Sequence, residues 1–194
     1  MSPVKPEYPQ LPFESAEAWD SWLAENHDSA PGVWAKLAKK ASGVPSVGYP
    51  EVLDIAISYG WIDGQRQALD DTHYLQKFTP RGPRSRWSKI NCDKATRMIE
   101  SGEMKPAGLR EVERAKADGR WDAAYEGQRT AKVPDDLQAA LDANPAAKQF
   151  YATLNSQNRY AVVYRVNDAK RPETRARRIA QFVEMLAKGE KLYP

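Results

Sequence analysis

The sequence has very little cysteine and histidine, and it has no long apolar run. A single cysteine, Cys92, means that no internal disulfide can form, which suits a reducing compartment. The mean hydropathy is -0.72, and no stretch is apolar enough to span a membrane. The first residues also lack the apolar core of a secretory signal. We therefore expect a cytoplasmic protein that does not insert into a membrane.

Motifs of several enzyme classes are missing as well. The chain has no glycine-rich phosphate loop, no dinucleotide-binding fingerprint and no serine nucleophile elbow. The two histidines, His27 and His73, are far apart, and neither has the spacing of a metal site, although Asp70 and Asp71 lie near His73. We expect no metal and no cofactor, and the residues identify no catalytic set.

The composition that remains is typical of a folded protein. Hydrophobic residues make up 41% of the chain and charged residues 28%, which excludes global disorder. A length of 194 residues is sufficient to bury a core. The net charge of +3 permits anionic partners without requiring them.

Residues 1–14 form a proline-rich segment that we expect to be an extended arm. Proline recurs at every third position from Pro3 to Pro12, which favours polyproline II and excludes helix. The aromatic residues Tyr8 and Phe13 would lie against the domain surface. Such an arm is also a candidate for docking to a protein partner.

Residues 15–91 are predicted to form an α+β part. Ser15 is a natural N-cap, Pro50 lies in the first turn of an apolar helical pattern, and Gly60 suits its end. Alternating runs predict strands, and Asp70-Asp71-Thr72 would join the last two as a hairpin. The patterns together predict a small antiparallel sheet covered by helices, with the helices at 15–27 and 49–60 and the strands at 32–40, 61–69 and 73–79.

Residues 92–194 are predicted to be all helical. Asn91 is a candidate N-cap for a helix over 92–101, and four further helices are expected to begin at prolines, namely Pro106, Pro134, Pro145 and Pro172. Another helix is expected within 155–170. Because no flexible linker separates the two parts at Asn91, we expect one compact α+β unit overall.

The main candidate site is a cationic segment, residues 77–97. It contains seven cations and one anion, a net charge of +6, whereas the whole chain carries only +3. Prolines and a glycine would hold arginine forks in place for phosphate or carboxylate. The candidate ligand residues are Arg66, Arg81, Arg84 and Lys89, with Trp87 stacking on a ring. The alternative is a solvated loop whose arginines pair with the acidic first helix.

Asp63 is a second candidate, within Trp61-Ile62-Asp63-Gly64. It could act as a general base, or orient Arg66 or Arg84. The alternative is a turn, in which Asp63 bonds to its own backbone and Gly64 supplies a positive φ. Tryptophans are most often core residues, so the sequence leaves open whether Trp61 and Trp87 belong to a site or to the core.

Two further features have a functional and a structural interpretation. The segment 165–178 has a net charge of +4, and a helix would place Arg171, Arg175 and Arg178 on one face. That face would extend an anion-binding surface, or it is the solvent-exposed face of an amphipathic helix. Cys92, near Lys89 and Lys94 at a helix start, would have a lowered pKa if exposed; otherwise it is a small buried residue.

A series of motifs in fixed order resembles the bacterial YdeI/OmpD-associated family, also named bacteriocin-protection proteins. They run from GWIDGQRQALDD and WSKIN through VPDDLQAALDANP and LNSQNRYAVVYRV to KRPETRARRIAQFVEMLAKGEKLYP. The likeness spans about residues 15–194, and about 120–187 looks like the C-terminal domain of that family. The resemblance implies a cytoplasmic bacterial protein linked to envelope stress or antimicrobial-peptide tolerance. It implies no agreed enzymatic activity and no catalytic residues.

The leading hypothesis from the sequence is a non-catalytic protein that binds a phosphorylated or carboxylated small molecule through the cationic segment. One alternative is sequence-independent nucleic-acid binding by the same segment together with Arg171, Arg175 and Arg178. Another is an enzyme of unspecified reaction that uses Asp63. The physiological partner and the oligomeric state are left open.

Overall fold

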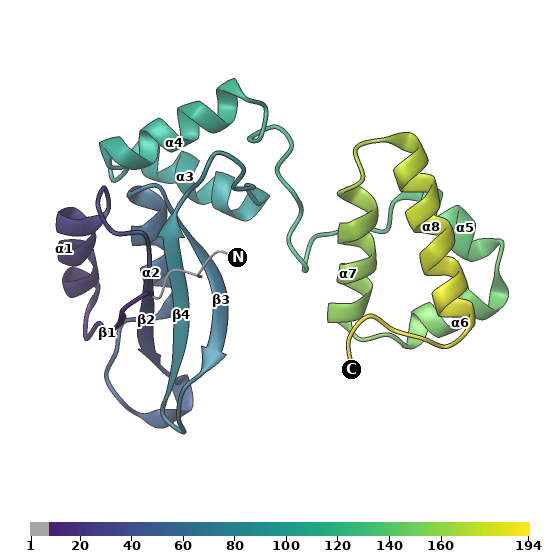
Figure 1. The fold of residues 1–194 in the computed structure, drawn as a ribbon, viewed down its shortest axis with the longest axis horizontal. Coiled ribbons are helices and arrows are strands. Elements are labelled where there is room, and N and C mark those ends of the chain that lie inside the picture. Colours follow the sequence, from purple (N-terminus) through teal and green to yellow (C-terminus); the bar gives the residue numbers. More distant parts are fainter. Residues whose placement is uncertain (1–7) are drawn as a thin grey trace, which may run out of the picture. The chain divides into compact units, whose positions relative to one another are not determined.

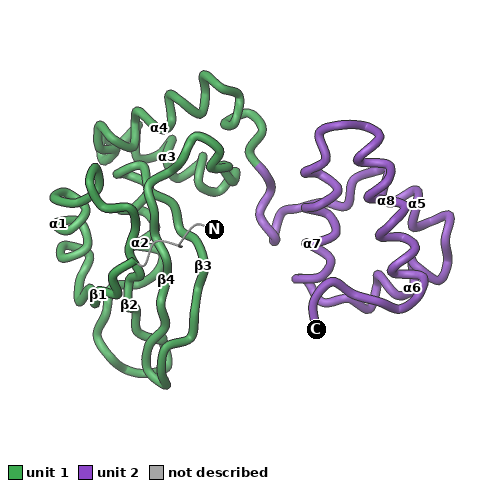
Figure 2. The backbone as a smooth tube through the Cα atoms, in the orientation of Figure 1, with its two compact units in different colours: residues 1–124 green, residues 125–194 purple. Residues whose placement is uncertain are grey.

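The computed structural model describes residues 8–194, and the chain falls into two compact units, Met1–Ala124 and Tyr125–Pro194 (Figure 2). The sequence predicted one compact unit, with its α+β part ending at Asn91. Helices α3 (Lys89–Ser101) and α4 (Pro106–Ala117) pack on helix α2 (Tyr49–Ser58), which covers the sheet, so they belong to the first unit. The chain is therefore α+β up to Ala124 and all helical after it.

The first unit is built on a four-stranded mixed sheet (Figure 1). The predicted strands are confirmed as β2 (Val33–Ala38), β3 (Trp61–Ala68) and β4 (His73–Pro80), with β4 antiparallel to both neighbours. The sequence missed β1 (Gln10–Pro12), which pairs parallel to β2 at the sheet edge. Proline is tolerated there because an edge strand needs fewer backbone donors.

The arm expected over residues 1–14 is thus a strand in part, and residues 1–7 lie outside the described residues. After β1 the chain turns toward the core. Phe13 is only 5% exposed and packs edge-on against Trp19. The aromatic contact expected of Phe13 is therefore present.

The hairpin predicted at Asp70-Asp71-Thr72 joins β3 to β4. A carboxylate shapes this turn: Asp70 Oδ1 accepts hydrogen bonds from the backbone N–H of Thr72 at 2.8 Å and of His73 at 2.7 Å. Hydrogen bonds from Thr72, first from its hydroxyl, lower the pKa of Asp70 well below its usual range. Asp70 therefore closes the turn through hydrogen bonds from the following backbone N–H groups to its side chain.

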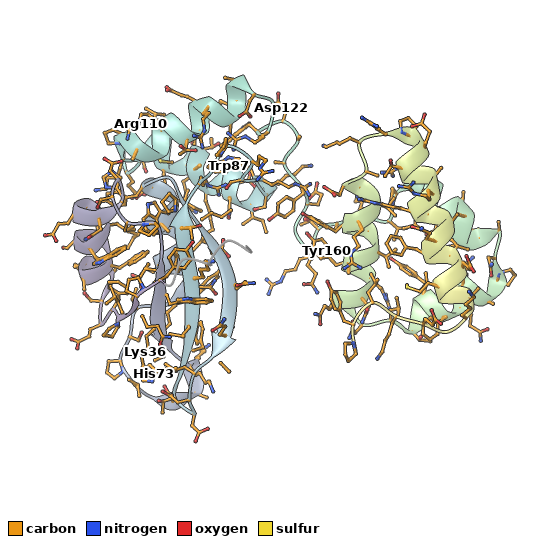
Figure 3. All side chains as sticks on the ribbon, viewed as in Figure 1. Lys36, His73, Trp87, Arg110, Asp122 and Tyr160 are labelled. Carbon is orange, nitrogen blue, oxygen red and sulfur yellow. The ribbon has the colours of Figure 1, made fainter. Side chains whose placement is uncertain are left out.

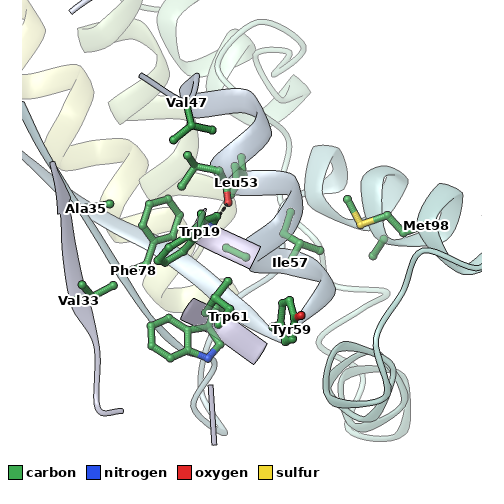
Figure 4. Packing of buried hydrophobic residues seen from close by; sticks show 14 of the residues in the cluster. Trp19, Val33, Ala35, Val47, Leu53, Ile57, Tyr59, Trp61, Phe78 and Met98 are labelled. Carbon is green, nitrogen blue, oxygen red and sulfur yellow. Dashed lines mark hydrogen bonds between the residues drawn. The ribbon is translucent and has the colours of Figure 1, made fainter. Parts of the chain in front are cut away.

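An aromatic cluster joins the sheet to α1 (Ala16–Asn26) and α2 (Tyr49–Ser58) (Figure 4). Trp19 is fully buried, stacks on Trp22 and contacts Phe78 of β4. Its indole N–H donates to the carbonyl of Val52 at 3.0 Å. Ser15 caps α1 as predicted, accepting from the N–H of Ala18 at 3.2 Å. The core therefore sits on one face of the sheet.

Helix α4 approaches the end of α2 very closely. A Cβ at Gly108 of α4 would overlap the carbonyl oxygen of Ser58, which is backbone and cannot move aside. Gly60, which ends α2 with a φ of 76°, would likewise place a Cβ 3.1 Å from the carbonyl oxygen of Ala107. Glycine at these two positions lets α4 lie on α2.

A short 3-10 turn, η1 (Lys40–Ser42), completes the elements of the first unit.

The second unit consists of four helices. The helices are α5 (Asp135–Asp142), α6 (Pro145–Thr153), α7 (Ser156–Asn167) and α8 (Pro172–Ala187). Asn144 and Asn155 cap α6 and α7. A separate core is formed by Leu137, Leu141, Val162, Val166, Ile179 and Leu186. Within residues 8–194, no helix has the length and apolar character needed to cross a membrane.

Gly108→Ala should destabilise the first unit by roughly 2 kcal/mol or more, because the added methyl overlaps a backbone carbonyl. In an open helix position, replacing glycine by alanine stabilises by about 1 kcal/mol. A loss of stability at Gly108 would therefore report the overlap with the Ser58 carbonyl. Urea unfolding followed by tryptophan fluorescence measures this unit alone, since all six tryptophans precede Tyr125. Gly119→Ala is the control: its Cβ would meet nothing within 4 Å, so it should lose only about 1 kcal/mol of left-handed strain. A stabilised Gly108→Ala protein would contradict the close approach.

Candidate functional site

The cationic loop, residues 81–88, connects the end of β4 to the start of α3. Helix α3 begins at Lys89 and not at Cys92 as predicted, because Ser88 is its N-cap: the Ser88 hydroxyl accepts from the N–H of Asn91 at 3.2 Å. Asn91 is instead a buried residue of the first turn, 8% exposed. The loop is thus fixed at one end by the sheet and at the other by a helix cap.

Arg81 is buried at the base of the cationic loop, with 4% of its surface exposed. Its guanidinium lies over the Trp87 ring, 3.6 Å from the ring centroid, and Nη1 donates to the carbonyl of Arg86 at 3.1 Å. Its backbone N–H donates to the carbonyl of Gly60 at 3.0 Å. Arg81 therefore ties the two ends of the loop together from the inside.

Trp87 and Trp61 are both core residues, each 1% exposed. Trp87 packs against Trp121 after α4, with ring centroids 5.0 Å apart (Figure 3). The indole N–H of Trp87 has no hydrogen-bond acceptor among residues 8–194. Trp61 donates to the carbonyl of His27 at 3.2 Å. The structure thus places both rings in the core of the first unit rather than on its surface.

Two arginines near the end of α4 donate hydrogen bonds to backbone carbonyls of the cationic loop and brace it. Arg114 Nη2 donates to the carbonyl of Arg81 at 3.1 Å, and Arg120 Nη1 donates to that of Ser85 at 2.8 Å. Asp118 holds Arg120 in place, and the hydrogen bond from Arg120 lowers the pKa of Asp118. The sequence analysis missed both braces, because they lie 33 and 35 residues away and no local pattern links them to the loop.

Arg84 occupies the outer side of the cationic loop and is exposed. The loop turns back on itself beside it: the Gly82 N–H donates to the Ser85 hydroxyl at 2.9 Å, and the Ser85 N–H donates to the Gly82 carbonyl at 3.0 Å. Lys89, the first residue of α3, is also exposed. Of the four candidate residues between 81 and 89, the structure directs Arg81 and Trp87 inward and Arg84 and Lys89 outward.

The other two candidates, Asp63 and Arg66, lie on β3, where a bulge separates them. The buried Gln76 side chain fills the bulge, donating to the carbonyl of Gly64 at 3.0 Å. Arg66 is exposed, lies over the Tyr74 ring and faces Gln76 across the ladder. That register puts Arg66 about 17 Å along the sheet from the start of the cationic loop, so a small anion would not reach both.

The turn considered for Asp63 and Gly64 is not present, because both residues lie within β3 and Gly64 has no positive φ. The Asp63 carboxylate accepts a hydrogen bond from the Tyr49 hydroxyl at 2.8 Å. Asp63 therefore joins the edge strand to the start of α2.

A carboxylate of α1 and one just after it pair with α4 and the residue before it. Asp20 lies 4.0 Å from Lys105, and Asp28 lies 3.8 Å from Arg110, which Figure 3 labels on α4. Metal-binding geometry is also absent in residues 8–194: no group of three or more histidine, cysteine or acidic side chains is placed to hold an ion.

The basic face predicted on the last helix is largely used within the second unit. Arg175 makes two hydrogen bonds to the Asp136 carboxylate and a third, at 3.0 Å, to the carbonyl of Val166. Arg178 donates to the carbonyl of Arg165 and lies 3.5 Å from Asp168. These contacts fix the start of α8 against α5 and the end of α7, and Arg171 remains exposed.

Among the described residues, cavities in other places are lined by none of the six candidate residues. One of about 900 Å³ lies between α5 and α8. Another of about 450 Å³ lies beside α7, and one of about 270 Å³ lies between α2 and α3. Because Arg84 and Lys89 are exposed, the cationic loop is a candidate for a surface contact.

The fold and the site define a class: an α+β unit with a braced cationic loop, followed by an all-helical unit. Family models agree with this division. A domain of unknown function, DUF8412, matches residues 11–111, and the model described as Bacteriocin-protection, YdeI or OmpD-Associated matches residues 130–189. The chain thus carries a DUF8412 domain, followed in its helical unit by a domain of the YdeI/OmpD-associated bacteriocin-protection family. No curated protein and no solved structure matches the chain.

Arg81→Ala should destabilise the first unit by roughly 2–4 kcal/mol, because it opens a cavity against Trp87 and removes the hydrogen bond to Arg86. Arg84→Ala, the matched control, should change the free energy of unfolding by less than about 0.5 kcal/mol, since Arg84 is exposed. Urea unfolding followed by tryptophan fluorescence compares the two. If both variants lost the same free energy of unfolding, or if Arg84→Ala lost more, the placement of Arg81 in the core and of Arg84 on the surface would be refuted.

Cys92 should be unreactive in the folded protein. The thiol is 8% exposed, and burial raises its pKa to about 11, against the opposing charges of Arg81 and Lys116. The lowered pKa considered for an exposed thiol therefore does not arise. With a disulfide reagent at pH 8, labelling should be slow in buffer and fast in urea, because only the thiolate reacts. Complete labelling of the native protein within the mixing time would be inconsistent with a buried thiol.

Proposed function

We propose that the protein is a non-catalytic binding protein whose first unit takes an anionic small molecule on the cationic loop, with Arg84 as the principal contact. The observation that supports this proposal is the division of labour among the arginines. Arg81, Arg114 and Arg120 bond to loop carbonyls, while Arg84 points to solvent from a loop held in one shape.

Preorganisation is what makes such a surface useful for binding. A mobile arginine loses side-chain and backbone freedom when it grips a ligand, and that loss reduces affinity. The cationic loop has already lost its backbone freedom through the braces and the Gly82–Ser85 turn. A guanidinium presented from it can form two parallel hydrogen bonds to phosphate or carboxylate.

Lys89 belongs to the proposal as a second exposed cation, at the start of α3. Arg66 would be used only by an extended ligand, because it lies farther along β3. Arg81 and Trp87 support the loop instead of contacting the ligand, since both are buried. Asp63 has no role in the proposal beyond its hydrogen bond with Tyr49.

The family description supplies the biological setting of the proposal. A chain with a domain of the bacteriocin-protection family is proposed to act in the cytoplasm, in tolerance of envelope stress or antimicrobial peptides. Binding of nucleic acid is the less favoured alternative, because Arg175 and Arg178 are engaged within the second unit. An enzymatic role for Asp63 gains no support from a lone carboxylate–tyrosine pair.

A thermal-shift titration of the full chain tests the proposal with defined probes: inorganic phosphate, pyrophosphate, citrate and a short oligonucleotide, each at low and moderate salt. A ligand of the native state raises the Tm by mass action. We expect a saturable rise with one of the small anions, and Arg84→Glu should weaken that binding at least tenfold, about 1.4 kcal/mol.

Lys40→Glu is the matched control, since it makes the same charge change in the same unit at the opposite end of β2 and leaves binding unchanged. A rise only with the oligonucleotide that disappears with salt would support nucleic-acid binding instead. No rise with any probe, or equal binding by Arg84→Glu, would falsify the proposal.

A further inference from the structure

The second unit has an open apolar groove beside its core. The α5–α8 groove has a volume of about 900 Å³ and is lined mainly by aliphatic side chains. Helices α5 and α8 lie beside each other in this unit and form its two walls (Figure 1). Apolar lining residues are Ala140 and Ala143 of α5 and Ala176, Ile179, Ala180, Val183 and Ala187 of α8.

Helix α8 carries apolar residues beyond those that its core buries. Leu186 is fully buried in the unit's core, with Phe182 packed against the same cluster. Beside this face runs a stripe of Ala176, Ala180, Val183 and Ala187, in which the three alanines are exposed and Val183 also packs against the core. Steps of four, three and four residues are those of a seam that faces a second helix along its length.

Hydrogen bonds tie the two walls of the groove together. Arg175 holds α8 to α5 through the Asp136 carboxylate, with Nη2 to Oδ1 at 2.8 Å, and holds it to α7 through the carbonyl of Val166. Alanine side chains on both walls allow another helix to approach closely, because the distance between helix axes depends on the side chains between them.

The charges beside the seam identify the occupant. Arg177 and Glu184 are both exposed and lie seven residues apart, so they flank the seam on the same side. If a second α8 lies antiparallel across the seam, Ala180 meets Val183 of the second copy and Ala176 meets Ala187. Arg177 of each copy then faces Glu184 of the other, twice, by symmetry. A parallel pairing would place like charges together.

We propose that the protein forms a two-fold dimer in which α8 of each copy lies antiparallel in the α5–α8 groove of the other. The apolar seam supplies the attraction, and the two Arg177–Glu184 pairs fix direction and register. The Glu184–Lys188 pair within α8, at 2.7 Å, is exposed on both sides and is compatible with a second cation at Glu184. This inference is independent of the proposed anion site, which lies in the other unit.

Sedimentation velocity of the full chain over a range of concentrations tests the dimer. We expect a monomer–dimer equilibrium, and Ala180→Glu should abolish it by placing a charge in the seam. Ala180 is exposed, so the substitution leaves the fold intact, which circular dichroism checks. Ala139→Glu, an exposed alanine of α5 that does not line the groove, is the matched control and should dimerise like the wild type.

Charge exchange tests the antiparallel register. Arg177→Glu and Glu184→Arg should each weaken the dimer at least tenfold, and the double variant should restore it, because the pairs are remade with reversed sign. A wild-type chain that stays monomeric at all concentrations would overturn the proposal. So would a dimer that survives Ala180→Glu, or a double variant no better than the singles. A foreign amphipathic helix or an apolar small molecule bound to a monomer would assign the groove to another occupant.

Discussion

The site depends on the contacts that the buried Arg81 guanidinium makes with the Arg86 carbonyl and the Trp87 ring. A buried cation is costly unless it is hydrogen-bonded and well packed. Arg81 donates from Nη1 to the Arg86 carbonyl and packs over the Trp87 ring. Its backbone joins the end of α2 through Gly60 and the end of α4 through Arg114. One residue thus connects the sheet, the cationic loop and two helices, and the loop becomes part of the core of its unit.

Regular elements could be predicted because their signals are local. Alternation identified β2, β3 and β4, and Ser15, Pro106 and Pro172 marked helix starts that the structure confirms. The strand β1 was missed because Pro9 and Pro12 favour an extended chain without pairing, and only the distant β2 turns that segment into a strand. The start of α3 was missed because Ser88 and Asn91 are equally good caps in isolation.

The candidate site was predictable as a segment and not as a set of side chains. Charge counting found the cationic loop, yet Arg81 and Arg84 look alike in sequence and have opposite roles in the structure. The loop backbone that presents these two side chains is held by Arg114 and Arg120, far along the chain. The same holds on α8, where Arg175 and Arg178 bond internally and Arg177 stays exposed. Net charge of a segment does not determine the direction of its side chains.

Nuclear magnetic resonance of the arginine Nε–H groups, recorded while pyrophosphate is added, tests the central claim most directly. Single arginine-to-lysine variants assign the signals. The account predicts that the Arg84 signal shifts saturably, while the Arg81 signal exchanges slowly with solvent and barely moves, because burial protects it. An Arg81 signal that exchanges as fast as exposed arginines, or that follows the anion while Arg84 stays still, would contradict the account.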